Sequence, residues 1–169
     1  MTSRAGDVAP VIRPIGESDW RQVHDLVVAV ATAGETYAMA VPATEQETRT
    51  VWSAQHVVVA VDGDTVLGSA TMGPNRPAQG SHVGTASFLV DPAARGRGVG
   101  RALGEYAVAW HRSAGRRAIQ FNAVVSTNAA AIALWHSLGF ATVGVVPQAF
   151  WLPDSSYADL LVMYLFLEP

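Results

Sequence analysis

The segment Val90-Asp91-Pro92-Ala93-Ala94-Arg95-Gly96-Arg97-Gly98-Val99-Gly100 decides the fold of this 169-residue chain. It leads from an apolar strand through a proline turn into a glycine-rich loop, and helix-forming residues follow at once. Glycine lets the backbone approach a ligand closely, and the first amides of a helix have no acceptor within the helix. These amides carry partial positive charge, so residues 95–100 are predicted to bind phosphate groups. A glycine-rich turn that only packs the helix against the sheet is the alternative interpretation.

Strands and helices are predicted on both sides of this loop from the spacing of apolar residues. We expect strands at Val11–Ile15, His56–Val61, Val66–Met72, Val83–Val90, Ala118–Val124, Phe140–Val146 and Leu160–Leu167. We expect helices at Ser18–Ala31, Thr44–Gln55, Val99–Ser113 and Asn128–Leu138. Asp62-Gly63-Asp64 is typical of a hairpin turn, and a loop holding Pro147 and Pro153 is expected between the last two strands. About seven strands and four helices predict a mixed α/β (α+β) domain.

Length and composition predict one folded domain. Half of the residues are hydrophobic and 15% are charged, so we expect a single domain over residues 1–169 with a flexible N-terminus at 1–9. The absence of cysteine excludes disulfides, thiolate metal ligands and a cysteine nucleophile, and no metal is expected. The first ten residues lack the apolar core of a signal peptide, and no run reaches the roughly 18 apolar residues that cross a bilayer. We therefore expect a cytoplasmic protein without a membrane partner.

The charge distribution favours a small anionic ligand over nucleic acid. The formal net charge of −3 argues against a general attraction to nucleic acid or to anionic membranes. From Tyr106 through Pro153 the chain contains no Asp or Glu. That span suits a polyanionic small molecule, although ordinary surface arginines in an alanine-rich chain would give the same pattern. Its basic side chains are His111, Arg112, Arg116, Arg117 and His136.

A dinucleotide-binding fingerprint is the main competitor for the glycine loop. Gly98-Val99-Gly100 with Gly104 also fits a Gly-x-Gly-x-x-x-Gly pattern. That fold needs its glycines after the first strand and an acidic residue about 20 positions later. Here the loop follows the fourth predicted strand, and the acid-free span begins at Tyr106. Both requirements fail.

The order strand, proline, Arg-x-x-Gly-x-Gly, helix, strand, Asn, helix, Gly-Phe resembles the GNAT acetyltransferase superfamily. Arg95, Gly98 and Gly100 fill its acetyl-CoA motif, and the resemblance runs from about Ser87 through Val146 and more loosely over the whole chain. It implies the GNAT fold and transfer of an acetyl group from acetyl-CoA to an amine. The acetyl-CoA contacts that it implies are Phe88, Leu89, Val90, Arg95, Gly96, Arg97, Gly98, Val99, Gly100, Arg101, Asn128 and Trp135.

The resemblance also implies roles for two of these positions. In the family, the strand before the loop splays from its neighbour and its backbone holds the pantetheine, and an amide there, assigned to Val90, stabilises the oxyanion by about 3 kcal/mol. Asn128 matches an Asn that binds the pantetheine arm, and it is equally suited to capping its helix. Trp135 stands where many members have the Tyr that protonates the leaving thiolate. Indole cannot act as an acid near neutral pH, so the general acid is left open.

The sequence also leaves the general base unassigned. The attacking amine must lose a proton, yet the predicted strands Val83–Val90 and Ala118–Val124 carry no carboxylate. We expect a water relayed by polar side chains of these strands or beside them. The candidates are Asn122, Ser87, Thr85 and His82.

A finer resemblance concerns the acceptor. The run Phe121–Val125 with Asn128 is similar to the branch that acetylates proline analogues such as azetidine-2-carboxylate, and more distantly to phosphinothricin acetyltransferases. In that branch the residue matching Asn122 faces the substrate, and Thr85 replaces an assisting Asn; a buried structural hydrogen bond is the alternative for Asn122. Asn122, Val90 and Thr85 are thus the predicted catalytic residues. Glu35 and Tyr37 are predicted, with Asn122, to border the acceptor, unless their loop is merely solvated.

The predicted function is therefore acetylation of a small amine, such as an amino acid or a toxic analogue, by direct attack in a ternary complex. Acetylation of a protein amine and a catalytically silent acyl-CoA-binding module are the alternatives. The apolar final strand makes pairing into a homodimer plausible.

Overall fold

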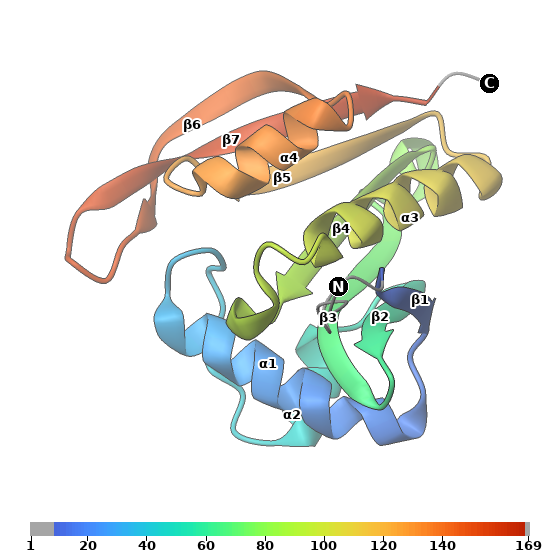
Figure 1. The fold of residues 1–169 in the computed structure, drawn as a ribbon. Coiled ribbons are helices and arrows are strands. Elements are labelled where there is room, and N and C mark those ends of the chain that lie inside the picture. Colours follow the sequence, from blue (N-terminus) through green and yellow to red (C-terminus); the bar gives the residue numbers. More distant parts are fainter. Residues whose placement is uncertain (1–8, 168–169) are drawn as a thin grey trace, which may run out of the picture.

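The computed structural model describes residues 9–167, which form one seven-stranded sheet with helices on both faces (Figure 1). The predicted flexible N-terminus lies, except for Ala9, outside the described residues. The predicted strand and helix numbers are confirmed, and the strand order is β1-β2-β3-β4-β5-β7-β6. The strands are β1 (Val11–Pro14), β2 (His56–Asp62), β3 (Thr65–Pro74), β4 (Val83–Val90), β5 (Ala118–Val125), β6 (Ala141–Trp151) and β7 (Tyr157–Phe166). The α-helices are α1 (Trp20–Ala33), α2 (Glu45–Val51), α3 (Val99–Ser113) and α4 (Ala129–Ser137), with short 3-10 turns at Glu17–Asp19, Ala78–Gly80 and Pro92–Ala94.

Alternate residues of the central strands are buried on opposite faces of the sheet, as the pleat requires. In β2, Val58 and Ala60 pack in the core beneath α3, whereas Val59 and Val61 pack in the core beneath α1. Helix α4 covers β5 and β7 with a third cluster that includes Phe121. Helices α1 and α2 therefore share one face of the sheet, and α3 and α4 cover the other. Within residues 9–167, no helix combines the length and the apolar character needed to span a bilayer.

The sheet opens between β4 and β5. These parallel strands pair only at Val83 with Ala118 and at Gly84 with Ile119. β4 continues to Val90 without a strand partner on that side, while β5 stays paired with β7 along its other edge. The chain segments on either side of this opening diverge in Figure 1.

Three predicted boundaries are wrong by three or more residues, and one of them is the start of the last strand, which lies at Tyr157 rather than Leu160. The second helix ends at Val51 rather than Gln55, because Trp52 is buried and its indole N–H donates to Ser69 Oγ at 3.0 Å. The sixth strand runs to Trp151 through Pro147, which was expected in a loop. Proline is tolerated there because β6 is an edge strand and its register shifts at this point.

Candidate functional site

The glycine loop has the backbone that an anion site requires. Gly96 and Gly98 have φ of +79° and +76°, and a Cβ at either position would meet no atom within 4 Å. Glycine is therefore needed for backbone conformation, and the space above the loop is open. Gly98 caps α3, and its carbonyl accepts from the Ala102 N–H at 2.9 Å. The amides of Val99, Gly100 and Arg101 precede that bond and have no acceptor within the helix.

Two of the three predicted loop arginines have partners in the protein. Arg97 forms an ion pair with Asp62 in the β2–β3 turn, with 2.7 Å between Nη2 and Oδ2. Arg101 donates to Ser137 Oγ of α4 at 2.8 Å. Arg95 is exposed. These contacts hold the loop to the β2–β3 turn on one side and to α4 on the other, and Gly96 and Gly98 are exposed.

The splayed edge of β4 presents two backbone groups to the opening. The Val83 carbonyl accepts a bond from the segment after β3, and the Asp91 N–H donates to β3, so odd positions face β3. Because backbone direction alternates along a strand, Phe88 and Val90 face the open side. Leu89 faces β3, and its side chain is buried. Of the three predicted β4 contacts, Leu89 is therefore the one turned away.

Tyr37 already occupies part of this edge. It comes from the loop between α1 and α2, donates its hydroxyl hydrogen to the Phe88 carbonyl at 2.9 Å, and accepts from the Phe88 N–H at 2.8 Å. Its ring packs edge-on against Trp52, with 6.1 Å between centroids. Burial raises the pKa of Tyr37 above its ordinary value of 10.0, with the hydrogen bond to Phe88 opposing. The hydroxyl is consequently protonated at neutral pH.

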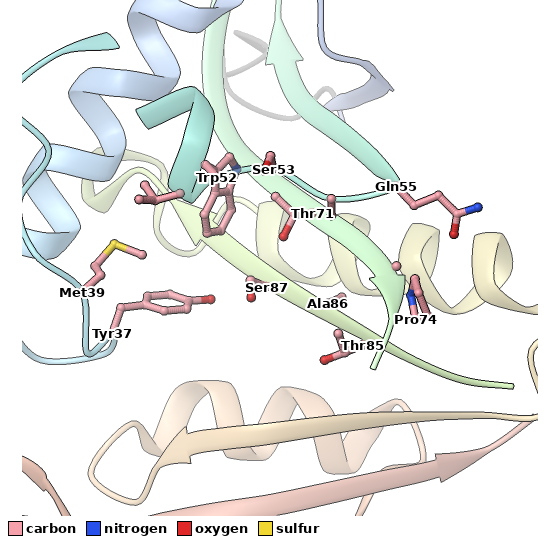
Figure 2. A pocket seen from close by; sticks show the side chains of 13 residues that line it. Tyr37, Met39, Trp52, Ser53, Gln55, Thr71, Pro74, Thr85, Ala86 and Ser87 are labelled. Carbon is pink, nitrogen blue, oxygen red and sulfur yellow. The ribbon is translucent and has the colours of Figure 1, made fainter. Parts of the chain in front are cut away.

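A pocket of about 390 Å³ lies beside this contact, on the face covered by α1 and α2 (Figure 2). Thr85 lines it, as does Tyr37, but Glu35 is exposed and is not among the lining residues. No charged side chain lines this pocket. The lining residues are Tyr37, Met39, Val51, Trp52, Ser53, Ala54, Gln55, Thr71, Gly73, Pro74, Thr85, Ala86 and Ser87.

Asn122 meets an amide that the sequence did not reveal. Its Nδ2 donates to Asn75 Oδ1 at 2.6 Å, and its Oδ1 accepts from Gln120 Nε2 at 2.8 Å. Asn122 lies in a register shift of β5 after Phe121 and is exposed, so the alternative of a buried structural hydrogen bond is wrong. Bulges often redirect a side chain beside a functional site. Asn75 directly follows the pocket residue Pro74, although neither Asn75 nor Asn122 is among the lining residues.

Asn128 and Trp135 have clear structural roles. Asn128 Oδ1 accepts from the Ala131 N–H at 3.2 Å and so caps α4, which leaves its amide hydrogens for another partner. Trp135 is buried against Phe88, with 4.7 Å between ring centroids. A Cβ on Gly104 would lie 2.9 Å from the Trp135 ring, so glycine is required where α3 meets α4.

The predicted base candidates divide between the pocket and the surface. Thr85 and Ser87 line the pocket, whereas His82 is exposed and precedes β4. No Asp, Glu or His side chain is among the lining residues. The expectation of a water relay stays a prediction. No group of three or more His, Asp or Glu side chains in the described part of the chain is placed to hold a metal ion.

Comparison with known proteins identifies the family. The family model for acetyltransferases of the GNAT family matches residues 20–140. The chain belongs to the GNAT acetyltransferase family. A GCN5-related N-acetyltransferase from Kribbella flavida is 48% identical to this GNAT protein, with a TM-score of 0.89 over 94% of this chain and 98% of that one. The yncA protein of Salmonella typhimurium, solved with its cofactor acetyl-CoA, is 25% identical, with a TM-score of 0.83 over 96% of each chain.

A curated relative of this GNAT protein acts on small molecules. The L-methionine sulfoximine/L-methionine sulfone acetyltransferase of Salmonella typhimurium is 33% identical over 113 residues, which are 66% of this chain and 65% of that protein. The chain spans less than two thirds of the length of the curated relatives it matches.

Proposed function

We propose that this GNAT protein transfers the acetyl group of acetyl-CoA to the amine of a small molecule. One observation carries the proposal: the open edge of β4 lies between a glycine loop suited to pyrophosphate and an uncharged pocket suited to an acceptor. Acetyl-CoA would place its pyrophosphate on the amides of residues 98–101 and its pantetheine along Val90, with Asn128 as a further contact. The presence of acetyl-CoA in the yncA structure supports acetyl-CoA as the acetyl donor.

The position of the pocket supports a proposal for the oxyanion donor. The pocket is lined by residues 85–87 of β4, so an acceptor amine approaches the strand next to Phe88. Val90 is two positions closer to the glycine loop. We therefore place the thioester oxygen on the Phe88 N–H and the pantetheine on Val90. The oxyanion role that the sequence predicted for Val90 thus passes to Phe88. The neutral amine then attacks the thioester carbon, a relayed water takes the amine proton, and the C–S bond breaks.

The proposal also names the chemical class of the acceptor, a small amine related to amino acids. A 390 Å³ pocket fits a small amine, and the methionine sulfoximine relative supports an amino-acid analogue. Thiol release from acetyl-CoA across a panel of amines, amino acids and their analogues tests this class directly. Acetylation of a peptide N-terminus or lysine in place of all small amines would favour a protein substrate. Tight acetyl-CoA binding without thiol release from any acceptor would indicate a silent binding module and overturn the proposal.

Replacement of Asn122 tests the acceptor side of the site. With the best acceptor, Asn122→Ala is expected to lower kcat/KM for the amine about tenfold, because one hydrogen bond is worth about 1.4 kcal/mol. The Kd of acetyl-CoA, measured by calorimetry, should stay within about twofold. Gln79→Ala, at an exposed position of the Ala78–Gly80 turn, serves as the matched control. A loss of acetyl-CoA binding in Asn122→Ala would instead assign Asn122 to the CoA side.

We further propose that the protein is a cytoplasmic homodimer that pairs through the β6–β7 ribbon. Edge strand β6 leaves one row of backbone groups unpaired, and its large apolar side chains are exposed. Light scattering should report a dimer, and the double variant Val145→Glu with Trp151→Glu should shift the mass toward the monomer. A monomeric wild-type protein at micromolar concentration would contradict this pairing. The exposed residues of β6 are Val143, Val145, Val146 and Trp151, and Tyr157 of β7, the pairing partner of Trp151, is also exposed.

A further inference from the structure

Tyr37 stands where the proposed CoA path meets the acceptor pocket. Its hydroxyl bonds both backbone groups of Phe88 at the open edge of β4, while its ring lines the pocket (Figure 2). The pantetheine would reach Phe88 along Val90, from the face covered by α3. The amine would reach it from the face covered by α1 and α2. The reacting atoms therefore come together within reach of this one hydroxyl.

Few other groups at this junction can supply a proton to sulfur. Trp135, in the position where a tyrosine is common, is buried against aromatic rings, and its indole is not an acid near neutral pH. Apart from Tyr37, the pocket is lined by no Asp, Glu, His, Lys, Arg or Tyr. Ser87 and Thr85 carry hydroxyls, whose acidity is far weaker than that of a phenol. The phenol of Tyr37 is the strongest acid in this lining.

We propose that Tyr37 donates its proton to the CoA sulfur as the thioester breaks. The inference rests on the proposed function. When the tetrahedral intermediate collapses, the C–S bond breaks, its electron pair goes to sulfur, and the Tyr37 O–H proton passes to that sulfur to form the free thiol. The phenolate then takes up the proton that the amine nitrogen lost, through the pocket water. The products are the acetylated amine and CoA thiol, and Tyr37 ends the cycle protonated.

The hydrogen bonds of Tyr37 fit this role. The Tyr37 hydroxyl accepts a hydrogen bond from the Phe88 N–H, which is the donor that we assign to the thioester oxygen. Acetyl-CoA binding must therefore displace the hydroxyl from this N–H. The displaced hydroxyl stays beside the thioester, because its ring is held against Trp52. Burial, which raises the pKa of Tyr37, keeps the phenol protonated at neutral pH, so the proton is present before the C–S bond breaks. No charged side chain of the pocket opposes that protonation state.

Tyr37→Phe tests the proposal against Tyr106→Phe, a matched loss of one phenolic hydroxyl on α3 that bonds His56. We expect kcat for the best acceptor to fall at least tenfold in Tyr37→Phe, with acetyl-CoA affinity unchanged or tighter because the competitor for the Phe88 N–H is gone. Tyr106→Phe should retain wild-type kcat. An unchanged kcat in Tyr37→Phe, with or without tighter acetyl-CoA binding, would overturn the proposal. Tyr37 would then be a residue that only occupies the Phe88 N–H until acetyl-CoA displaces it.

Fluorinated tyrosine at position 37 separates proton donation from packing. Fluorination lowers the phenol pKa with little change in shape, so the alkaline limb of the kcat profile should move to lower pH by the same amount. A limb that stays in place would overturn the proposal even if Tyr37→Phe is slow. Wild-type protein that transfers no acetyl group to any amine would refute the proposed function instead, which distinguishes the two failures.

Discussion

Acidification from pH 7 to pH 4 is expected to cost the folded protein about 3 kcal/mol through one side chain, His111. Its imidazole is 0% exposed and lies where the β4–β5 pairing ends. Burial is the largest cause that lowers the pKa of His111 from 6.5 to about 4; the nearby Arg116 charge adds to this, and the hydrogen bond to Thr85 opposes it. One pKa unit corresponds to about 1.4 kcal/mol, so the lowered pKa of His111 costs the folded protein about 3 kcal/mol at pH 4.

The hydrogen bonds of His111 explain why protonation is so costly. Nε2 lies 3.0 Å from the Thr85 carbonyl, which only accepts, so Nε2 carries the hydrogen. Nδ1 is buried and has no hydrogen-bond partner among residues 9–167, so protonation would create a charged donor without an acceptor there. The ring cannot move toward β4, because it fills the space beside Gly84. Between pH 6.5 and 4 the unfolded chain binds the proton and the folded chain does not, so stability is complete above pH 6.5 and falls through this window.

Urea denaturation at pH 7, 5.5 and 4.2 measures this dependence. His111→Gln keeps a donor for the Thr85 carbonyl and removes the titration, so its stability should vary much less over the same range. His82→Gln, at an exposed ring, should keep the wild-type slope. Asp19 does not interfere with this measurement, because the hydrogen bond from Arg13 lowers its pKa from 3.8. The stability that Asp19 contributes is therefore lost only below the pH range of the measurement. Equal slopes for wild type and His111→Gln would show that His111 accepts a proton without cost.

The sequence was sufficient where a local pattern determines the structure. Gly96 and Gly98 signal positive φ because other residues are strained there, and the helix after them follows from propensity. Asp62-Gly63-Asp64 likewise predicted the hairpin between β2 and β3, which the structure confirms. Alternation of apolar residues predicted the strands that lie on two covered faces. Each of these features depends on residues that are close together in the chain.

Features that depend on distant residues were missed. Helix α2 ends four residues before the predicted boundary, because the buried indole of Trp52 donates a hydrogen bond to Ser69 in β3. Helix propensity takes no account of such a tertiary contact. Asn75 and Asn122 are 47 positions apart, and only the splay of β4 from β5 and the bulge in β5 bring their amides together. Tyr37 lines the pocket whereas Glu35 of the same loop does not, and the prediction that this loop borders the acceptor stays a prediction. The hydrogen bonds between Tyr37 and Phe88 could not be predicted, because they depend on the open edge of β4, which no local sequence pattern specifies.

A carboxylate at position 98 is expected to weaken acetyl-CoA binding about a hundredfold relative to an amide at the same position. Asp and Asn have nearly the same shape, and both tolerate the left-handed backbone of Gly98 better than other residues. Gly98→Asp and Gly98→Asn should therefore fold equally well and differ in charge. A carboxylate about 5 Å from a phosphate is repelled by roughly 3 kcal/mol at an effective dielectric constant near 20, which corresponds to about a hundredfold in Kd.

Calorimetric titration of both variants with acetyl-CoA measures this ratio, and the ratio should shrink as salt screens the charges. Gly115→Asp provides the control for a new carboxylate on a left-handed glycine with open surroundings, because Gly115 has φ of +71° beyond the other end of α3. It should bind acetyl-CoA as the wild type does. If Gly98→Asp and Gly98→Asn bind equally, the pyrophosphate does not lie on this loop. The CoA path along Val90 to Phe88, and with it the role of Tyr37, would then have to be abandoned, since all three depend on where the loop places the phosphates.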